Sequence, residues 1–141
     1  MTVKDLFEKY CTKTEEGKYL CRCHRVTLRP ASAEELQTFR DHCKEYGVEQ
    51  QVEDELAEFY SQTNSLFNYF VCNDESIFEW WEDEEKSLWL GCMDDETFVY
   101  NAEHHKYAIG YAGSSDIGEY DSIMEMLEAY LKEGWENGWN G

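Results

Sequence analysis

Residues 87–112 read SLWLGCMDDETFVYNAEHHKYAIGYA and contain three short runs rich in aromatic and β-branched residues, at 87–92, 96–101 and 106–112. The polar segments MDD and AEHH separate these runs and are typical of tight turns. Connections this short join neighbouring antiparallel strands, because parallel strands need a crossover of roughly a dozen residues or more. The stretch therefore predicts the centre of an antiparallel β-meander.

Two further runs of similar composition come before this stretch. LFNYFVC, residues 66–72, and SIFEWWE, residues 76–82, are aromatic, and the turn-like segments NDE and DEEK follow them. With these runs the sequence predicts a meander of about five strands. GSSDIGEYD, residues 113–121, has the glycine and serine content of a loop, and we predict a loop there.

Helical periodicity flanks the strands on both sides. A capping box of Ser32 and Glu35 begins a helix that Gly47 ends, and Thr2 is the expected N-cap of an earlier helix. Apolar spacing predicts two more helices, at residues 52–64 and, after the strands, at 122–134. Helices before and after a run of strands predict an α+β domain with the helices packed on the sheet.

Two less regular segments remain. KYLCRCHRVTL, residues 18–28, alternates well enough to predict one strand, which Arg29 and Pro30 end. The tail WENGWNG, residues 135–141, holds two tryptophans among glycine and asparagine and continues a helix poorly. We expect the tail to fold back and cover a sheet edge, with an exposed hook as the alternative.

The strand predicted at 106–112 has one face of small side chains, because Ala108, Gly110 and Ala112 alternate with larger residues. Small side chains let another backbone or helix approach closely. The closing helix at 122–134 is the occupant that we expect on this face, and a binding partner is the alternative.

The net charge of −19 is unevenly distributed. Residues 1–30 hold seven Lys/Arg and four Asp/Glu, whereas the remaining 111 residues hold five and twenty-seven. This acidity effectively excludes nucleic acid as a direct ligand and would steer a basic protein partner towards the chain. Solubility, or adaptation to a salty environment, is the alternative explanation of the same charge.

The sequence predicts a single cytoplasmic domain over residues 1–141. It shows no apolar run like a signal peptide or a membrane span, so we expect no membrane association. In that compartment the six cysteines, at positions 11, 21, 23, 43, 72 and 92, are expected to be reduced and mostly buried. The oligomeric state is left open.

Cys21, Cys23 and His24 form the cluster that most resembles a metal site, and Cys11, His42 or Cys43 could complete it. However, Cys-x-Cys-His is not a usual structural zinc spacing. On a single strand Cys21 and Cys23 would share one face and His24 would point to the other. We therefore favour a strand that buries two small thiols, and we expect no metal, no cofactor and no catalytic residue.

The segment from Asp74 to Glu103 combines eleven acids with a single base, Lys86. Strand alternation would place Trp80 and Trp81 on opposite faces. Tryptophans ringed by charge are typical of binding hot spots, in which the ring anchors the partner and the acids steer it. The alternative is a helix-packed sheet with a solvated acidic turn. The residues predicted to bind a partner are Trp80, Trp81, Glu82, Asp83, Glu84, Glu85, Asp94 and Asp95.

Three segments resemble the SUKH superfamily. VEDELAEFYSQTNSLF, residues 52–67, is similar to its helix motif, SLWLGCMDDETFVYN, residues 87–101, to its strand–turn–strand, and GEYDSIMEMLEAYLKE, residues 118–133, to its closing helix. The likeness covers roughly residues 31–134, with 1–30 as a basic helix–strand extension and 135–141 as a Trp/Gly tail. The chain departs from the family at the motif proline, where Glu53 or Asp54 stands, and at a glycine that Ser65 replaces.

The resemblance implies binding and not catalysis, because the superfamily includes bacterial immunity proteins that neutralise cognate toxins and fungal regulators of cell-wall synthesis. The function we expect is therefore that of a non-enzymatic acidic immunity protein, which occludes the basic groove of a cognate toxin such as a nuclease. A regulatory scaffold that binds several host proteins is the alternative. A carboxylate- or metal-based hydrolase is less favoured.

Overall fold

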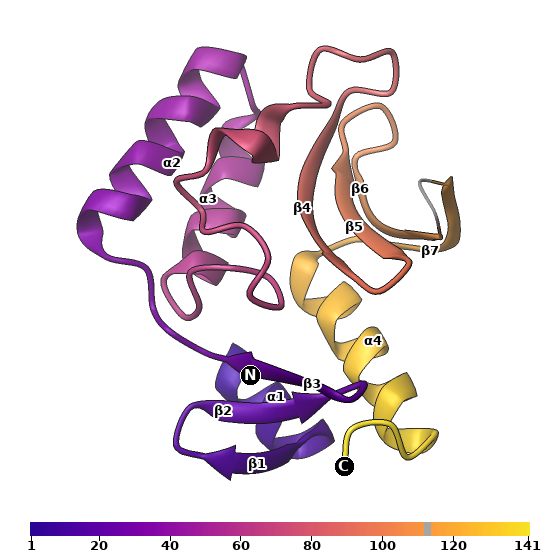
Figure 1. The fold of residues 1–141 in the computed structure, drawn as a ribbon. Helices are drawn as coiled ribbons and strands as arrows, with labels where there is room; N and C mark the ends of the chain where they lie inside the picture. The colour runs from indigo at the N-terminus through magenta and orange to yellow at the C-terminus, as the bar shows by residue number, and fades with distance from the viewer. Residues whose placement is uncertain (112–113) are drawn as a thin grey trace.

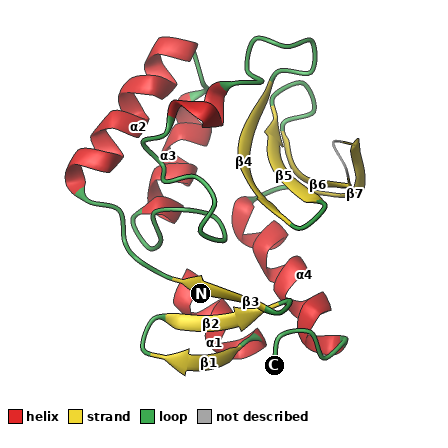
Figure 2. Cartoon of the chain, in the orientation of Figure 1, coloured by secondary structure: helices red, strands yellow, loops and turns green. Residues whose placement is uncertain are grey.

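The computed structural model of the chain describes residues 1–111 and 114–141, and the side chains of 1–111 and 118–141. The described part is an α+β fold of four α-helices and two antiparallel sheets, as the sequence predicts (Figures 1 and 2). The elements are α1 (Val3–Tyr10), β1 (Thr12–Glu15), β2 (Lys18–Cys21), β3 (His24–Thr27), α2 (Ala33–Tyr46), α3 (Gln50–Tyr60), the 3₁₀ helix η1 (Glu75–Phe78), β4 (Ser87–Met93), β5 (Glu96–Asn101), β6 (Lys106–Tyr111), β7 (Ser114–Tyr120) and α4 (Ile123–Glu136).

The larger sheet is an antiparallel meander in the order β4-β5-β6-β7. Phe98 pairs with Ile109, and Tyr100 with Tyr107, so these four residues share one face and belong to the core. The ring of Phe98 lies 4.9 Å from that of Tyr130 on α4. Helix α4 therefore covers this face, and it runs from the larger sheet to the smaller one (Figure 1).

The meander has four strands and not about five, because neither segment 66–72 nor segment 76–82 is a strand. In the first, Phe67 and Asn68 have positive φ, and the pairing is limited to one bridge between Ser65 and Val71. In the second, η1 begins at Glu75 and is followed by turns. Phe67, Phe78 and Trp81 are buried from compact turns, whereas Tyr69 is exposed and Phe70 and Trp80 are partly exposed. Aromatic composition alone therefore did not indicate extended backbone.

The predicted loop at 113–121 contains a strand instead. Strand β7 pairs with β6, with Tyr107 opposite Tyr120 and Ile109 opposite Gly118. A side chain at Gly118 would lie 2.8 Å from the hydroxyl of Tyr120, so glycine here makes room for that ring. Residue 113, where the predicted loop begins, lies outside the described residues.

The smaller sheet, in the order β1-β2-β3, replaces the single strand predicted at 18–28. Strands β2 and β3 form a hairpin whose two turn residues, Arg22 and Cys23, have φ of 49° and 69°. Both values are typical of a type I′ turn, which normally uses asparagine or glycine and was therefore not recognised. The turn also corrects the predicted cysteine geometry, since Cys21 is buried and Cys23 is exposed.

The local capping signals predicted from sequence are confirmed. Thr2 and Ser32 each form a capping box, and Gly47 ends α2 in the left-handed conformation with φ of 76°. Helices α2 and α3 are then joined by a cluster around Glu53, whose side chain is 1% exposed. Its Oε2 accepts hydrogen bonds from Arg40 Nη1 at 2.7 Å and Lys44 Nζ at 3.0 Å. Burial raises the pKa of Glu53, but the bonds from Lys44 and Arg40 outweigh burial and lower this pKa overall.

The tail folds back, as predicted, but the residue that anchors it is Asn140. Its side chain is fully buried, and its Nδ2 donates to the carbonyl oxygens of Tyr10 and Leu131, both at 2.9 Å. Its backbone oxygen accepts from the N–H of Thr12 at the start of edge strand β1. The tryptophans are exposed instead, Trp135 by 45% and Trp139 by 43%.

We predict that Glu53→Gln lowers the free energy of unfolding by about 1–3 kcal/mol at neutral pH, because charge-assisted hydrogen bonds are lost. A carboxyl group with a lowered folded-state pKa contributes stability above its unfolded pKa of about 4.3, and this contribution is lost as the pH falls. The difference from the wild type should therefore shrink in urea unfolding below about pH 4. The exposed Glu45→Gln is the control, and an equal loss in both variants would contradict the role of Glu53.

We predict that Asn140→Ala lowers the free energy of unfolding by about 2–4 kcal/mol, because it leaves several buried backbone groups without partners. The exposed Asn137→Ala should change it by less than about 0.5 kcal/mol. Urea unfolding of both variants measures the difference. Similar midpoints for the two would show that Asn140 does not hold the tail.

Candidate functional site

The acidic turn between η1 and β4 is held by Trp81, which is 4% exposed. Its Nε1 donates to the carbonyl oxygen of Tyr46 on α2 at 2.6 Å. The backbone closes the turn because the carbonyl oxygen of Trp80 accepts from the N–H groups of Asp83 and Ser87. As a result, the four consecutive carboxylates from Glu82 to Glu85 are all exposed to solvent.

Trp80 lies on the other side of the turn, half-buried at the surface. Its ring stacks on that of Trp89 in β4, with centroids 4.5 Å apart and planes inclined by 7°. Phe70 meets Trp89 edge-on at 5.0 Å and extends the aromatic surface. Trp80 and Trp81 thus have different surroundings, as predicted, but the cause is the turn in which they lie and not the alternation of a strand.

A groove of about 650 Å³ begins at this turn and continues over the larger sheet. One wall carries Trp80 and the four carboxylates, and the floor is the sheet face opposite to α4. Thr97 and Gly110 are paired neighbours on this floor. The described lining residues are Trp80, Glu82, Asp83, Glu84, Glu85, Ser87, Thr97, Val99, Asn101 and Gly110.

The floor corrects the role expected for the small residues of β6. We predicted that the closing helix covers the face of Ala108, Gly110 and Ala112, but α4 packs on the opposite face, and Gly110 lines the groove. Ala112 lies outside the described residues. The floor is formed by Thr97, Val99 and Asn101 of β5 and by Gly110 of β6, which adds no side chain to it.

The carboxylates of the groove have no cationic partner within the described side chains. Lys86 is the adjacent base, but its Nζ lies above the ring of Trp81 at 5.2 Å. The acids of residues 1–30 differ, since Glu16 contacts Lys13 at 2.7 Å and Lys4 at 3.0 Å. Among the described side chains, these four carboxylates therefore form no direct ion pair with a lysine or arginine, although Lys86 lies nearby.

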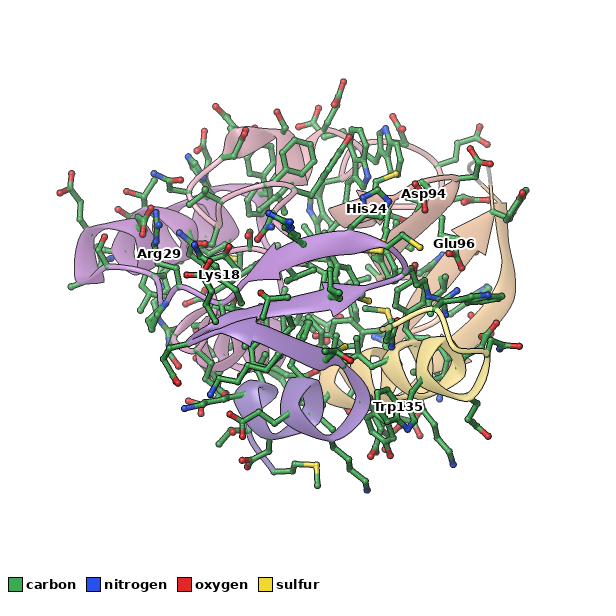
Figure 3. All side chains as sticks on the ribbon, turned by 60° about the horizontal axis from the view of Figure 1, so that its bottom comes forward. Lys18, His24, Arg29, Asp94, Glu96 and Trp135 are labelled. Carbon is green, nitrogen blue, oxygen red and sulfur yellow. The ribbon has the colours of Figure 1, made fainter. Side chains whose placement is uncertain are left out.

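Asp94 and Asp95 do not belong to this groove. They lie in the turn between β4 and β5, at the other end of these strands, because Ser87 pairs with Asn101 and Met93 with Glu96. Asp94 Oδ1 is instead 2.8 Å from His24 Nε2 of the β2–β3 hairpin, and the two side chains lie next to one another (Figure 3). The structure thus brings Trp80 together with Glu82–Glu85 and leaves three predicted residues elsewhere: Trp81, Asp94 and Asp95.

Sequence reasoning missed the floor residues Thr97, Val99 and Asn101. Alternation on β5 places them opposite to the core residues Phe98 and Tyr100, so the strand pattern contained this signal. The pattern did not show that the acidic turn lies over the same face.

Two further observations concern metal binding and membranes. Within the described residues, no three His, Cys, Asp or Glu side chains are grouped closely enough to hold a metal ion. None of the described helices is both long enough and apolar enough to cross a membrane.

We predict that Trp81→Phe lowers the free energy of unfolding by about 1–3 kcal/mol, because it removes the hydrogen bond to Tyr46 and leaves that carbonyl without its partner. Trp135→Phe, at an exposed tryptophan, is the control and should change stability by less than about 0.5 kcal/mol. Urea unfolding followed by circular dichroism measures both. A Trp81→Phe variant as stable as the control would show that the Trp81 hydrogen bond does not hold the acidic turn.

Comparison of the chain with models of protein families, with curated proteins and with solved structures finds no match. The resemblance to the SUKH superfamily therefore stays a prediction from the sequence.

Proposed function

We propose that this chain is a non-enzymatic binding protein that neutralises a basic protein partner, namely a cognate toxin domain, through the acid-rimmed groove. The observation that carries the proposal is the combination of four unpaired carboxylates and a stacked tryptophan pair above a floor of small side chains. A basic chain segment complements such a surface in both charge and shape.

The carboxylates and the aromatic rings have separate roles in the proposed complex. Glu82, Asp83, Glu84 and Glu85 attract the basic partner over distances up to the Debye length, which is about 8 Å at physiological salt. Trp80 is the anchor, because a lysine or arginine of the partner gains a cation–π contact with its ring. The small floor residues leave room for the partner's backbone to approach the sheet.

Occlusion is the proposed mechanism of neutralisation. A basic groove that otherwise holds a phosphate backbone would be filled by the exposed acidic turn, which carries several carboxylates within a few residues. The partner then loses access to its substrate without any covalent change. The resemblance to the SUKH superfamily supports this proposal, because that family includes intracellular antidotes to toxins.

The proposal predicts that changing Glu82, Asp83, Glu84 and Glu85 together to Ala slows association with the partner by about tenfold or more at low salt. The partner is first isolated from native extract with the wild-type chain and is then measured by stopped-flow association. The same variant should also flatten the dependence of the association rate on salt, because steering by these charges is lost.

A charge-matched variant separates the groove from the overall charge. Glu34, Asp41, Glu58 and Glu136 are exposed acids outside the groove, and changing them to Ala removes the same four charges. This control should keep most of the wild-type rate, while Trp80→Ala in the native background should speed dissociation. If the groove variant and the control bind the partner equally, the groove is not the binding surface.

A further inference from the structure

Cys11 and Cys21 form a pair of buried thiols in the smaller sheet, and neither belongs to the groove. Cys11 follows α1, and Cys21 ends β2. Thr12 pairs with Leu20 in this sheet, so the next pair outward is Cys11 opposite Cys21. The neighbouring Cys21 thiol and burial together raise the pKa of the Cys11 thiol.

The backbone around the pair is compatible with a cross-strand disulfide. The N–H of Cys11 bonds to the carbonyl oxygen of Phe7, and Cys21 is paired with His24 on its other side. Cys11 and Cys21 therefore face each other as a non-hydrogen-bonded pair, for which the Cα atoms of antiparallel strands approach to about 4.5 Å. Disulfides span Cα distances of about 4.4–6.8 Å, so little backbone movement is needed.

Asn140 forms hydrogen bonds with the backbone of residues adjacent to both cysteines. Its side chain donates to the carbonyl oxygen of Tyr10, and its backbone oxygen accepts from the N–H of Thr12, so it bonds to both neighbours of Cys11. Its Oδ1 accepts from the N–H of Arg22, which follows Cys21. A short tail after α4 is thus bonded to the backbone next to both cysteines, and a terminal segment of this kind can open without unfolding the rest of the chain.

We propose that Cys11 and Cys21 are an oxidisable pair that closes to a disulfide when residues 137–141 detach and a small-molecule disulfide such as glutathione disulfide reaches them. The Cys11 thiolate attacks glutathione disulfide and displaces one glutathione thiolate. The Cys21 thiolate then attacks the Cys11 sulfur of the mixed disulfide and displaces the second. Two protein thiols are oxidised, glutathione disulfide is reduced to two glutathione molecules, and these take up the two protons.

The test uses the full chain with Cys23→Ser, because Cys23 is exposed and would react with the oxidant by itself. The protein is incubated with glutathione disulfide, quenched in acid, alkylated under denaturing conditions and digested for mass spectrometry. We expect a linked peptide that joins Cys11 to Cys21. Asn140→Ala should increase the rate of its formation by about tenfold or more, because the tail then opens more often. Asn137→Ala should leave the rate unchanged.

Alkylation of the buried Cys43, measured in the same samples without denaturant, reports global unfolding. Closure of the pair much faster than Cys43 reacts supports local opening of the tail, whereas equal rates would overturn it. Cys11 and Cys21 that stay reduced, or that end as separate glutathione adducts, in the folded Asn140→Ala variant would overturn the disulfide itself. Equal closure rates in the wild type and in Asn140→Ala would overturn gating by Asn140.

Discussion

The amide of Asn140 is a buried polar group that ties three separate segments of the fold together. It bonds to the end of α1, to α4 and to the β2–β3 turn. A side chain at Gly134 would lie 2.5 Å from its Oδ1, so the helix leaves a space that the amide fills. From the turn the connection continues to the larger sheet, since Arg22 lies 3.7 Å above the ring of Tyr130 and the Tyr130 hydroxyl donates to Glu96 of β5. One buried polar group thus links segments that hydrophobic packing alone would orient less uniquely.

Those parts of the fold that depend on local chemistry were predictable from the sequence. The capping boxes at Thr2 and Ser32 and the stop at Gly47 need residues only three or four positions apart, so their signals are complete in a short window. Strand β7 was missed because its glycine and serine residues indicate a loop, and only pairing with β6 makes it a strand. The prediction for the segment around Phe78 was wrong in the opposite way. Its aromatic composition indicated a strand, but the segment begins with a 3₁₀ helix that buries Phe78.

The candidate site shows the same division between local and long-range information. The acidic turn and Trp80 follow from composition and from the position of Ser87 as the start of a strand. The groove itself does not, because it requires the turn after η1 to lie over the Thr97–Gly110 face of a sheet formed later in the chain. For the same reason the sequence wrongly groups Asp94 with Glu82–Glu85. It lies near them in sequence, but the length of β4 places it at the opposite end of that strand.

The charges of the two regions differ in how they are balanced, and this bears on partner selection. In residues 1–30 three lysines contact neighbouring acids, as with Lys13 and Glu16 or Lys18 and Glu15, so these acids are paired within the region. At the groove the carboxylates face solvent, and Lys86 lies over Trp81. A basic molecule that approaches the groove therefore meets four adjacent carboxylates that no lysine or arginine pairs within the described side chains. The hydrogen bond from Trp81 to Tyr46 holds the turn so that Trp81 is buried and the four acids beside it face solvent.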